Sequence, residues 1–401
     1  MPAGRKMKTI KISSKKSIYL IDLHPYCENS SFFWARVNLF FRLNGYKLSP
    51  DAKGAAVLIL TGCAVVDPII EKSREVISKL LKTFPGKTIV LFGCIAPLLN
   101  FKQNGRLITI NSKDLDRFSL LFESRIPISE CGAGLLSEGF CRHPLGSSEK
   151  DKFVNISQGC SNNCSYCNIK LSKGGVKSVP AARIKADVKK LAAGGAREIT
   201  LLADDCGSYG HDINTNIAEL FQELPKTGYA GRQLKYKIHY MFPEFLIRYY
   251  PQLKPAFLDH RITDINVPLQ SGAPRVLKLM NREYDLRELS SILREIRKNN
   301  PKIRIISSFM INFPGETMAE FRQSLYYARL FNFALFLAYC DNKRTSVSRL
   351  GPKCTDKDLE QKTREVKAAI KKKTIRGILV TQPGLPDEFP DSLPLSETEG
   401  R

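Results

Sequence analysis

Three closely spaced cysteines, Cys160, Cys164 and Cys167, most constrain what this chain can fold into. They follow a C-x3-C-x2-C pattern, so one short loop must present three thiols together. A tetrahedral zinc site needs four ligands, and no histidine follows at zinc-finger distance. A cubane cluster has four irons, and three thiolates leave one iron open for another ligand. The pattern predicts an iron–sulfur cluster; the alternative is a structural zinc knuckle or three unrelated thiols.

This loop resembles that of radical S-adenosylmethionine (SAM) enzymes, with Tyr166 as the aromatic residue just before the last cysteine. The resemblance implies that the amino and carboxylate groups of SAM chelate the open iron. It also implies that one electron cleaves SAM to a 5′-deoxyadenosyl radical. Tyr166 is then expected beside the bound SAM.

Composition indicates a globular, strongly basic protein. The chain has 401 residues, enough for two or three domains, and 43% of them are hydrophobic. Lysine and arginine number 62 against 39 acidic residues, and this net charge of +23 favours polyanionic partners, with a merely solvated surface as the alternative. We find no signal peptide and no apolar run of membrane-spanning length. We therefore expect a reducing, cytoplasmic location, where cysteines serve as metal ligands rather than disulfides.

Residues 1–145 are predicted to form an open α/β domain. Apolar runs at 17–23, 55–60 and 87–92 indicate strands, and helical patterns at 32–43 and 68–81 separate them. This alternation favours a parallel sheet with crossover helices.

A second set of cysteines follows these strands. Cys27, Cys63 and Cys94 each come just past the end of one predicted strand. The carboxyl ends of parallel strands share one edge, where ligands bind, so the three thiols are expected to converge. The small residues Gly62, Ala64 and Gly93 are expected to leave room for a cluster; three buried apolar cysteines are the alternative.

An α/β domain with three cysteines ahead of a radical-SAM barrel resembles the methylthiotransferase family, which modifies tRNA bases or a ribosomal protein. The segments TGCAV at 61–65 and GCIAP at 93–97 are similar to the family's NTCAV and GCMAQ motifs, and CENS at 27–30 is a looser match to CQMN. The resemblance implies that Cys27, Cys63 and Cys94 hold a second 4Fe–4S cluster, from which sulfur is delivered.

A cobalamin-dependent radical-SAM methylase is a rival interpretation. The residues Asp22-Leu23-His24 begin like the D-x-H-x-x-G loop that binds cobalamin. However, Cys27 occupies the position of the glycine, and this interpretation leaves Cys63 and Cys94 without a function.

Residues 146–345 are predicted to form a partial (β/α)6 barrel with cofactor sites at the carboxyl ends of its strands. Predicted strands lie at 153–156, 198–203, 235–240, 264–269, 304–311 and 333–339, and predicted helices at 181–193, 217–224, 276–281, 286–299 and 318–331.

Three loops at these strand ends resemble family motifs. They are DCGSYG at 205–210, PLQSG at 268–272 and NFPGET at 312–317, and VLKLMNR at 276–282 follows the second of them as in the family. Asp205 is a candidate to bind a hydroxyl or a cation, and Gln270 and Ser271 are candidates to bind the amino acid or ribose of SAM.

The chain departs from the family in several places expected near the substrate entrance. Lys173-Gly174 replaces Arg-Gly, Ser178-Val179 replaces Ser-Arg, and KRTS at 343–346 replaces RPGT. Residues 346–401 are expected to hold a basic helix at 356–375 and a disordered tail, without the small β-barrel in which the family normally ends. Within that helix, the lysines at 371–373 are candidates to contact phosphate.

The resemblance therefore implies a methylthiotransferase with two 4Fe–4S clusters, SAM and a reducing electron donor. The favoured substrate is a tRNA adenosine, because of the charge, and the alternative is a protein or peptide side chain. A non-catalytic iron–sulfur scaffold is a further alternative.

Overall fold

The computed structural model describes residues 11–24, 27–99, 101, 106–131 and 152–381. Among these, residues 11–64 and 68–131 form one compact unit, and residues 65–67 and 152–381 form the other. Residues 132–151, and residues 382–401 with most of the predicted tail, lie outside the described residues. Each unit is an α/β fold, as the sequence predicts.

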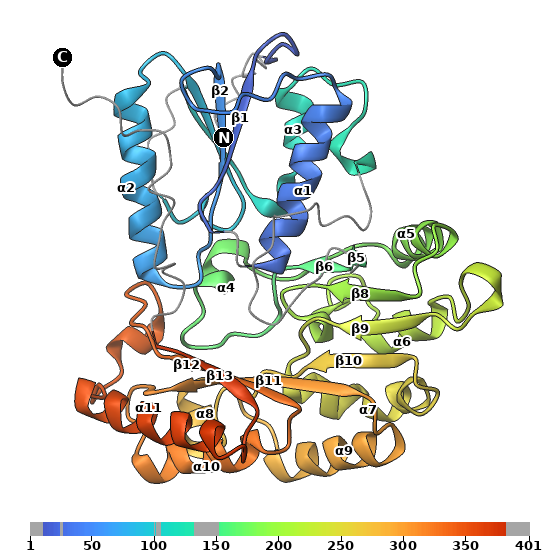
Figure 1. The fold of residues 1–401 in the computed structure, drawn as a ribbon, viewed down its shortest axis with the longest axis vertical. Coiled ribbons are helices and arrows are strands. Elements are labelled where there is room, and N and C mark those ends of the chain that lie inside the picture. Colours follow the sequence, from blue (N-terminus) through green and yellow to red (C-terminus); the bar gives the residue numbers. More distant parts are fainter. Residues whose placement is uncertain (1–10, 25–26, 100, 102–105, 132–151, 382–401) are drawn as a thin grey trace, which may run out of the picture. The chain divides into compact units, whose positions relative to one another are not determined.

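The first unit contains a four-stranded parallel sheet in the order β1-β2-β3-β4 (Figure 1). The strands are β1 (Ile18–Asp22), β2 (Val57–Thr61), β3 (Thr88–Phe92) and β4 (Leu107–Ile110). Strands β2 and β3 are almost entirely buried, as expected for parallel strands covered on both faces. The first three strands confirm the prediction, whereas β4 is a short strand that the sequence analysis missed.

Helices α1 (Glu28–Leu43), α2 (Asp67–Thr83) and α3 (Arg117–Leu121) accompany this sheet. Helix α1 fills the core with aromatic side chains. Trp34 stacks on Phe92 at a ring-centroid distance of 5.8 Å, and Phe41 meets Phe122 edge-on at 4.9 Å. Such aromatic pairs add to the stability gained from burial.

The second unit contains a seven-stranded parallel sheet in the order β13-β12-β11-β10-β9-β8-β5. These strands are β5 (Lys152–Asn155), β8 (Glu198–Leu202), β9 (Lys235–Ile238), β10 (Ile262–Asn266), β11 (Arg304–Ile311), β12 (Phe333–Ala338) and β13 (Gly377–Val380). The short strands β6 (Ser157–Gln158) and β7 (Lys177–Ser178) form a separate antiparallel pair. All six predicted strands are present, and β13 adds a seventh.

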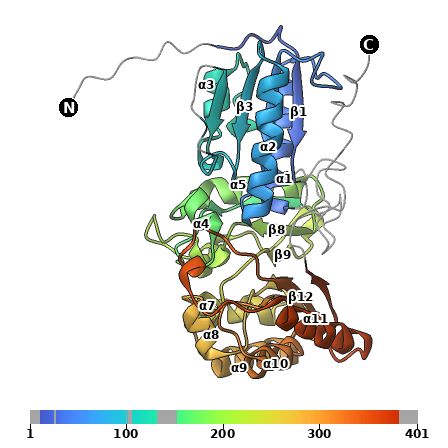
Figure 2. The same cartoon turned by 90° about the vertical axis from the view of Figure 1, so that its left-hand side faces the viewer.

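The helices of this unit are α4 (Asn168–Lys173), α5 (Ala181–Ala193), α6 (Ile217–Glu223), α7 (Pro243–Leu258), α8 (Pro274–Leu279), α9 (Leu286–Asn299), α10 (Met318–Ala328) and α11 (Asp356–Lys371). Figures 1 and 2 both show α8, α9 and α10 gathered on one side of the sheet. Side chains cap their starts: Asp285 accepts two backbone N–H bonds at α9, and Thr317 forms a capping box at α10.

Residues 346–381 are part of the second unit and contain a strand, whereas only a basic helix and a disordered tail were expected after residue 345. Strand β13 pairs with β12, and α11 packs near it. A Cβ on Gly377 would lie 2.1 Å from the carbonyl oxygen of Ala334, so the strand must begin with glycine. The glycine shortens the apolar run of this strand to residues 378–380, which conceals it from pattern analysis.

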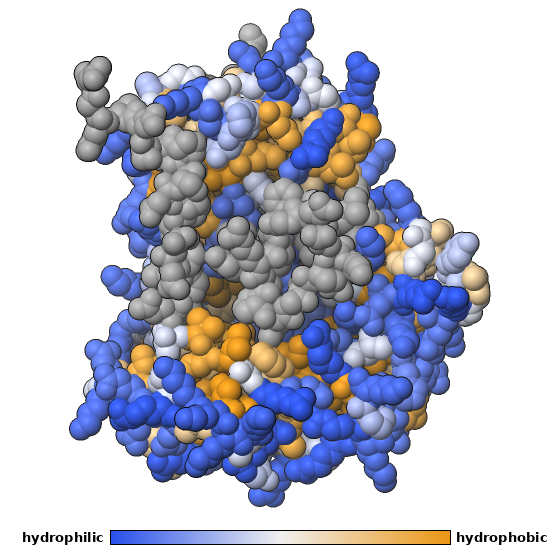
Figure 3. All heavy atoms as spheres, viewed as in Figure 1, coloured by the Kyte–Doolittle hydropathy of each residue, from blue (hydrophilic) through white to orange (hydrophobic). Residues whose placement is uncertain are grey.

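On the face that Figure 3 shows, the outer edge of the second unit is largely hydrophilic, and apolar residues are visible toward its middle. Other apolar residues of this unit form a buried core around the sheet. None of the helices that the structure describes has the length and hydropathy needed to cross a bilayer.

Candidate functional site

The cysteine loop follows β5 and β6, and hydrogen bonds hold its backbone. The N–H of Cys160 donates to the carbonyl of Gly174 at 3.3 Å. The N–H of Ser165 donates to the carbonyl of Met280 at 3.0 Å, and its hydroxyl donates to the carbonyl of Leu279 at 2.8 Å. The loop is thereby fixed to the ends of α4 and α8, which gives the three thiols a defined backbone.

Cys160 lies among polar groups. The Nδ2 of Asn162 donates to its Sγ at 3.3 Å, the hydroxyl of Ser208 lies 3.6 Å away, and Oδ2 of Asp205 lies 3.8 Å away. Burial raises the pKa of the Cys160 thiol to about 12, and the Asp205 carboxylate adds to the rise. The thiol therefore needs a bound metal to become a thiolate near neutral pH.

Asp205, predicted to bind a hydroxyl or a cation, forms hydrogen bonds with this loop and its neighbours, and its contact with a ligand stays a prediction. Its Oδ1 accepts hydrogen bonds from the N–H groups of Gly207 and Phe242, both at 3.0 Å. Its Oδ2 accepts from the hydroxyl of Ser208 at 2.6 Å and from Nδ2 of Asn162 at 3.0 Å. A carboxylate has about four acceptor positions, and these four donors fill them.

Cys167 occupies the N-cap of α4, and its Sγ accepts from the N–H of Lys170 at 3.4 Å. Lys170 also donates from Nζ to the carbonyl of Cys160 at 2.7 Å. Burial raises the pKa of the Cys167 thiol to about 11, with Cys164 as the next contributor. The N–H groups at the start of α4 would favour the anionic ligand form once a metal binds.

Arg282 contacts the cysteine loop, a role that the sequence analysis missed. Its guanidinium is buried, and Nη1 donates to Sγ of Cys164 at 3.6 Å and to the hydroxyl of Tyr166 at 3.2 Å. Nη2 donates to the carbonyl of Pro268, and the guanidinium lies 3.9 Å from the ring centroid of Phe242. The only signal in the sequence was an arginine ending the motif at 276–282.

The positions at which the chain departs from the family also support this loop. The Nζ of Lys173 is buried and lies 2.7 Å from Oδ1 of Asp204, whose Oδ2 accepts from the N–H of Gly159 at 2.8 Å. The hydroxyl of Ser346 donates to the carbonyl of Ser165 at 3.2 Å. Ser346 therefore contacts the cysteine loop directly and Lys173 supports it through Asp204, and a position of either residue near the substrate entrance stays a prediction.

Gln270 and Ser271 follow β10 but differ in what they offer. Gln270 has a φ of 70°, and its Nε2 donates to the hydroxyl of Ser308 at 3.3 Å. Its Oε1 is buried without a hydrogen-bond partner among the described residues, so it is available to accept from a ligand. Ser271 is fully buried, and its hydroxyl accepts from the N–H of Ala273 at 3.2 Å and lies 3.4 Å from that of Ser324. Ser271 shapes the turn, and Gln270 is the candidate ligand contact.

Cys27, Cys63 and Cys94 follow three adjacent strands of the first unit. Thr61, the last residue of β2, pairs with the last residues of β1 and β3, so the three strands end level. Cys63 and Cys94 come shortly after these ends and are buried, and Cys27 is half-buried at the N-cap of α1. The three cysteines therefore follow strand ends that share one edge of the sheet, and their joint binding of a cluster stays a prediction.

The glycines beside these cysteines have a different role from the one expected. Gly93 has a φ of 89°, and a Cβ there would lie 2.7 Å from Oγ1 of Thr61. A Cβ on Gly62 would contact Ile95 at 3.4 Å. The glycines therefore serve the backbone path and close packing, and do not mark an open volume.

The donor set of the Cys160 loop fits an iron–sulfur cluster. Within the described parts of the chain, no three His, Cys, Asp or Glu side chains converge closely enough for a single metal ion. A cubane instead offers a separate iron to each thiolate. Each thiol of the loop accepts a hydrogen bond from an N–H group. Such bonds stabilise anionic sulfur ligands and tune a cluster's potential.

Comparison with known proteins agrees with this chemistry. The sequence profile of the Radical SAM superfamily matches residues 154–327. The chain is 29% identical over 293 residues to a probable threonylcarbamoyladenosine tRNA methylthiotransferase of Pyrococcus abyssi, an alignment that covers 71% of this chain and 67% of the relative. It is 28% identical over 334 residues to the ribosomal protein uS12 methylthiotransferase RimO of Carboxydothermus hydrogenoformans, covering 79% and 74%.

Among solved structures, the radical SAM methyltransferase TsrM from Kitasatospora setae, with cobalamin and a 4Fe–4S cluster bound, is similar in fold. The TM-score is 0.54 at 12% identity, over 83% of this chain and 77% of TsrM. At this identity the likeness concerns the fold alone, and it agrees with the predicted α/β class.

Proposed function

Because the chain is a radical SAM protein distantly related to tRNA and ribosomal-protein methylthiotransferases, we propose that it attaches a methylthio group at an unactivated C–H carbon of a macromolecule. We propose a tRNA adenosine as the substrate. The similarity to a tRNA-modifying relative supports this choice, and so does the net charge of +23, which favours polyanions.

The observation that carries the proposal is the presence of two cysteine trios on two different sheets. One trio lies on the loop after β5 and β6, and the other follows the level ends of β1, β2 and β3. Two separate 4Fe–4S clusters are proposed to bind there. When bound, the first cluster and one SAM would supply the radical that removes the hydrogen atom, the second cluster the sulfur, and a second SAM the methyl group.

The protein's own residues hold and orient these groups. Asp205, Asn162 and Ser208 fix the position of Cys160, so the first cluster would sit in a defined place. Arg282 places a positive charge beside Cys164. The free acceptor Oε1 of Gln270 is proposed to receive a hydrogen bond from SAM. Such positioning, with exclusion of water, is the usual contribution of a protein to cofactor chemistry.

Cluster content tests the two metal sites. After anaerobic reconstitution we expect about eight irons per wild-type chain, and about four in each of two triple variants. The variants are Cys160→Ala/Cys164→Ala/Cys167→Ala and Cys27→Ala/Cys63→Ala/Cys94→Ala. About four irons in the wild type, with none left in the first variant, would refute the second cluster.

Activity separates an enzyme from an iron–sulfur scaffold. The reduced wild type should cleave SAM to 5′-deoxyadenosine, and the variant lacking Cys160, Cys164 and Cys167 should not. Methylthio-adenosines in tRNA from a deletion strain should be fewer than in the parent strain, and should return when the wild-type gene is restored. Identical nucleoside profiles would reject tRNA adenosine as the substrate.

A protein side chain is the second candidate substrate. The similarity to a ribosomal protein uS12 methylthiotransferase over 79% of the chain favours it. Mass spectrometry of ribosomal proteins from the same two strains would show a methylthio mass difference if this candidate is correct.

A further inference from the structure

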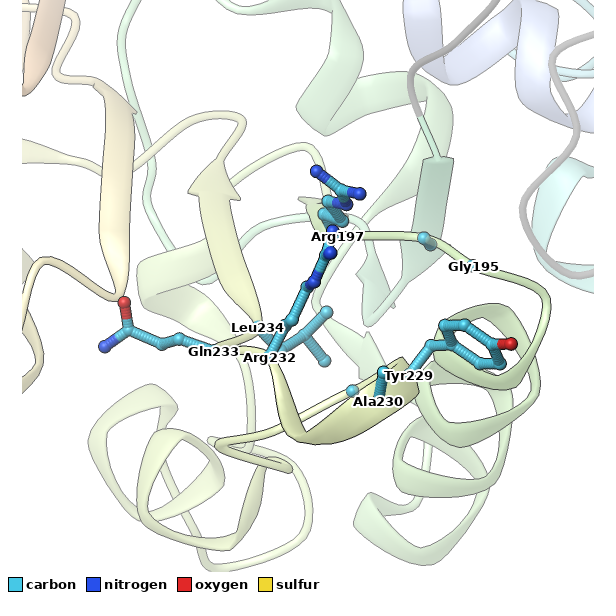
Figure 4. Close-up of a pocket in the computed structure, with 9 residues that line it drawn as sticks. Gly195, Arg197, Tyr229, Ala230, Arg232, Gln233 and Leu234 are labelled. Atoms are coloured by element: carbon cyan, nitrogen blue, oxygen red, sulfur yellow. The ribbon is translucent and has the colours of Figure 1, made fainter.

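A pocket lies on the rim of the second unit opposite to the Cys160 loop. It has a volume of about 320 Å³ and forms where the turn before β8 meets the loop before β9 (Figure 4). The two segments precede the amino ends of their strands, whereas Cys160 and Asp205 follow carboxyl ends. We call it the Arg197 pocket; its lining includes Gly195, Arg197, Gly228, Tyr229, Arg232 and Leu234.

Two arginines give this pocket its charge. Arg197 and Arg232 are exposed, and no carboxylate in the described parts of the chain pairs with either guanidinium. The neighbouring Glu198 is already engaged by Lys237, whose Nζ lies 2.6 Å away. The exposed Lys226 adds positive charge close by. Unneutralised guanidiniums lining one pocket suit a bound phosphate, which they can contact through paired N–H groups.

An aromatic side chain projects from the same loop. Tyr229 is 68% exposed, so its ring is open to solvent. Ala230 and Gly231 follow with φ values of 56° and 68°, so a left-handed bend sets the direction of the loop at this point. Figure 4 shows the ring of Tyr229 pointing to the opposite side from Gln233, with Arg197 and Arg232 between them. Guanidiniums beside an exposed ring are the combination with which proteins bind unpaired RNA, by phosphate contact and base stacking.

We propose that the Arg197 pocket is a docking site for an unpaired segment of the tRNA substrate. Arg197 and Arg232 hold a phosphate, and a base stacks on Tyr229. This inference rests on the proposed function in taking tRNA as the substrate, but it concerns a surface away from the proposed chemistry. A tRNA molecule is large enough to be held at one rim while another part is modified.

The test measures tRNA affinity of the anaerobically reconstituted full chain by fluorescence anisotropy at several salt concentrations. The variant Arg197→Gln/Arg232→Gln should bind tRNA about tenfold more weakly. A plot of log K against the logarithm of the salt concentration should have a slope that is shallower by about 2. The control Arg364→Gln/Lys367→Gln removes the same charge from the exposed face of α11, beside the other end of the sheet, and should bind like the wild type.

The ring is tested separately from the charge. Tyr229→Ala should weaken binding about tenfold with an unchanged salt slope, and Tyr229→Phe should restore it, because stacking needs only the ring. Cleavage of SAM without tRNA should match the wild type in all of these variants, which shows that the fold and the Cys160 site are intact.

Each outcome is decisive. If the wild type binds tRNA and the pocket variants bind equally well, the pocket proposal is wrong while tRNA methylthiolation stands. If the pocket variant and the α11 control lose tRNA affinity equally, the binding reflects general charge attraction, and the pocket proposal is again wrong. If the wild type shows no affinity for tRNA, both the pocket and the tRNA substrate are rejected, and a polypeptide is favoured.

Discussion

The guanidinium of Arg282 lies 3.6 Å from the sulfur of Cys164, measured from Nη1 to Sγ. This residue comes 118 positions after the cysteine, and its side chain is buried. A buried charge needs compensation, which here comes from the thiol, the Tyr166 hydroxyl, a main-chain carbonyl and an aromatic ring. We infer that Arg282 sets the charge beside the cluster that the loop would hold.

Replacing Arg282 with Met should lower the reduction potential of that cluster. A unit charge about 5 Å from an added electron is worth about 3 kcal/mol at an effective dielectric of about 20, which is on the order of 100 mV. Loss of the cation disfavours the reduced cluster, so cleavage of SAM should also slow. A redox titration followed by electron paramagnetic resonance measures the shift, and Arg282→Lys should give a smaller one because the charge remains.

Arg304→Met is the matched control, because Arg304 is an exposed arginine at the amino end of β11, where it pairs with Asp264. In Arg304→Met, the reduction potential of the cluster should equal that in the wild type. If Arg282→Met keeps both its iron and the wild-type potential, Arg282 does not influence the cluster electrostatically.

A second prediction concerns Gly207, which allows the loop that contains Asp205 to pack closely against α7. A Cβ on Gly207 would lie 2.5 to 2.8 Å from three carbon atoms of Phe245. Gly207→Ala should displace this loop and weaken the contacts of Asp205 with Cys160 and Asn162. The free energy of unfolding of the second unit should fall by about 1–3 kcal/mol. The expected result is less retained iron and slower SAM cleavage. Gly175→Ala is the control, since a Cβ there meets nothing within 4 Å; an equal loss in both variants would reject the steric explanation.

The fold could be predicted from sequence where apolar runs were long and regular. The three first-unit strands that precede the cysteines and six strands of the second sheet were found in this way. Helix α7 was missed because Pro251 and Pro255 interrupt its pattern, although Pro243 at its start is well placed for a helix. Strands β4 and β13 were missed, although β5 and β9, which are equally short, were found.

The sequence identified the cysteine loop as a candidate site, and cluster binding by its thiols stays a prediction, but the contacts of its polar residues could not be predicted. Asp205 and Ser271 follow strand ends, where polar residues serve either a ligand or the loop itself. Only the positions of the hydrogen-bond donors show that the acceptor positions of Asp205 are occupied and that Ser271 lies in a turn. Arg282 was overlooked because its contacts join residues far apart in sequence. Spacing along the chain indicates candidate metal ligands, whereas contacts between residues far apart in sequence appear only once the chain has folded.

The third prediction concerns a buried ion pair between α11 and the loop after β11. The Nζ of Lys362 lies 2.8 Å from Oε2 of Glu316, and these side chains are 1% and 0% exposed. Burial raises the pKa of Glu316, and Lys362 opposes the rise. Lys362→Met leaves a buried carboxylate without its partner and should lower the free energy of unfolding by about 3–5 kcal/mol. The double variant Lys362→Met/Glu316→Gln should recover much of this stability.

Denaturant unfolding of the full chain measures the free energy of unfolding, and hydrogen exchange of the α11 amides measures the local stability of that helix. The control is Arg322→Met, which removes an exposed pair between α10 and α11, with Nη2 of Arg322 2.8 Å from Oε1 of Glu365. It should cost less than about 1 kcal/mol. If Lys362→Met costs no more than this control, the buried pair does not anchor α11.

The last prediction is a pH dependence of the first unit that arises from Asp22 at the end of β1. Its Oδ2 is buried without a hydrogen-bond partner among the described residues, and its Oδ1 accepts from the N–H of His24 at 2.9 Å. Burial raises the pKa of Asp22 to about 6, although the His24 N–H and the His24 side chain oppose the rise. The folded state therefore favours the protonated acid, while the unfolded chain keeps the ordinary pKa near 3.8. The stabilising contribution is complete below pH about 4 and is lost as the pH rises through 6, a difference of up to about 3 kcal/mol.

Trp34, the only tryptophan of the chain, is stacked on Phe92 in this unit, so its fluorescence reports the unfolding of the first unit. The urea midpoint of Asp22→Asn should change less between pH 5 and pH 7.5 than that of the wild type, because the group that titrates in this range is gone. At pH 7.5 the variant should be more stable, by up to about 1.5 M urea in midpoint. Asp116→Asn, an exposed aspartate of the same unit, should follow the wild type. Parallel pH profiles of the wild type and Asp22→Asn would mean that the Asp22 carboxyl does not change its charge between these two pH values.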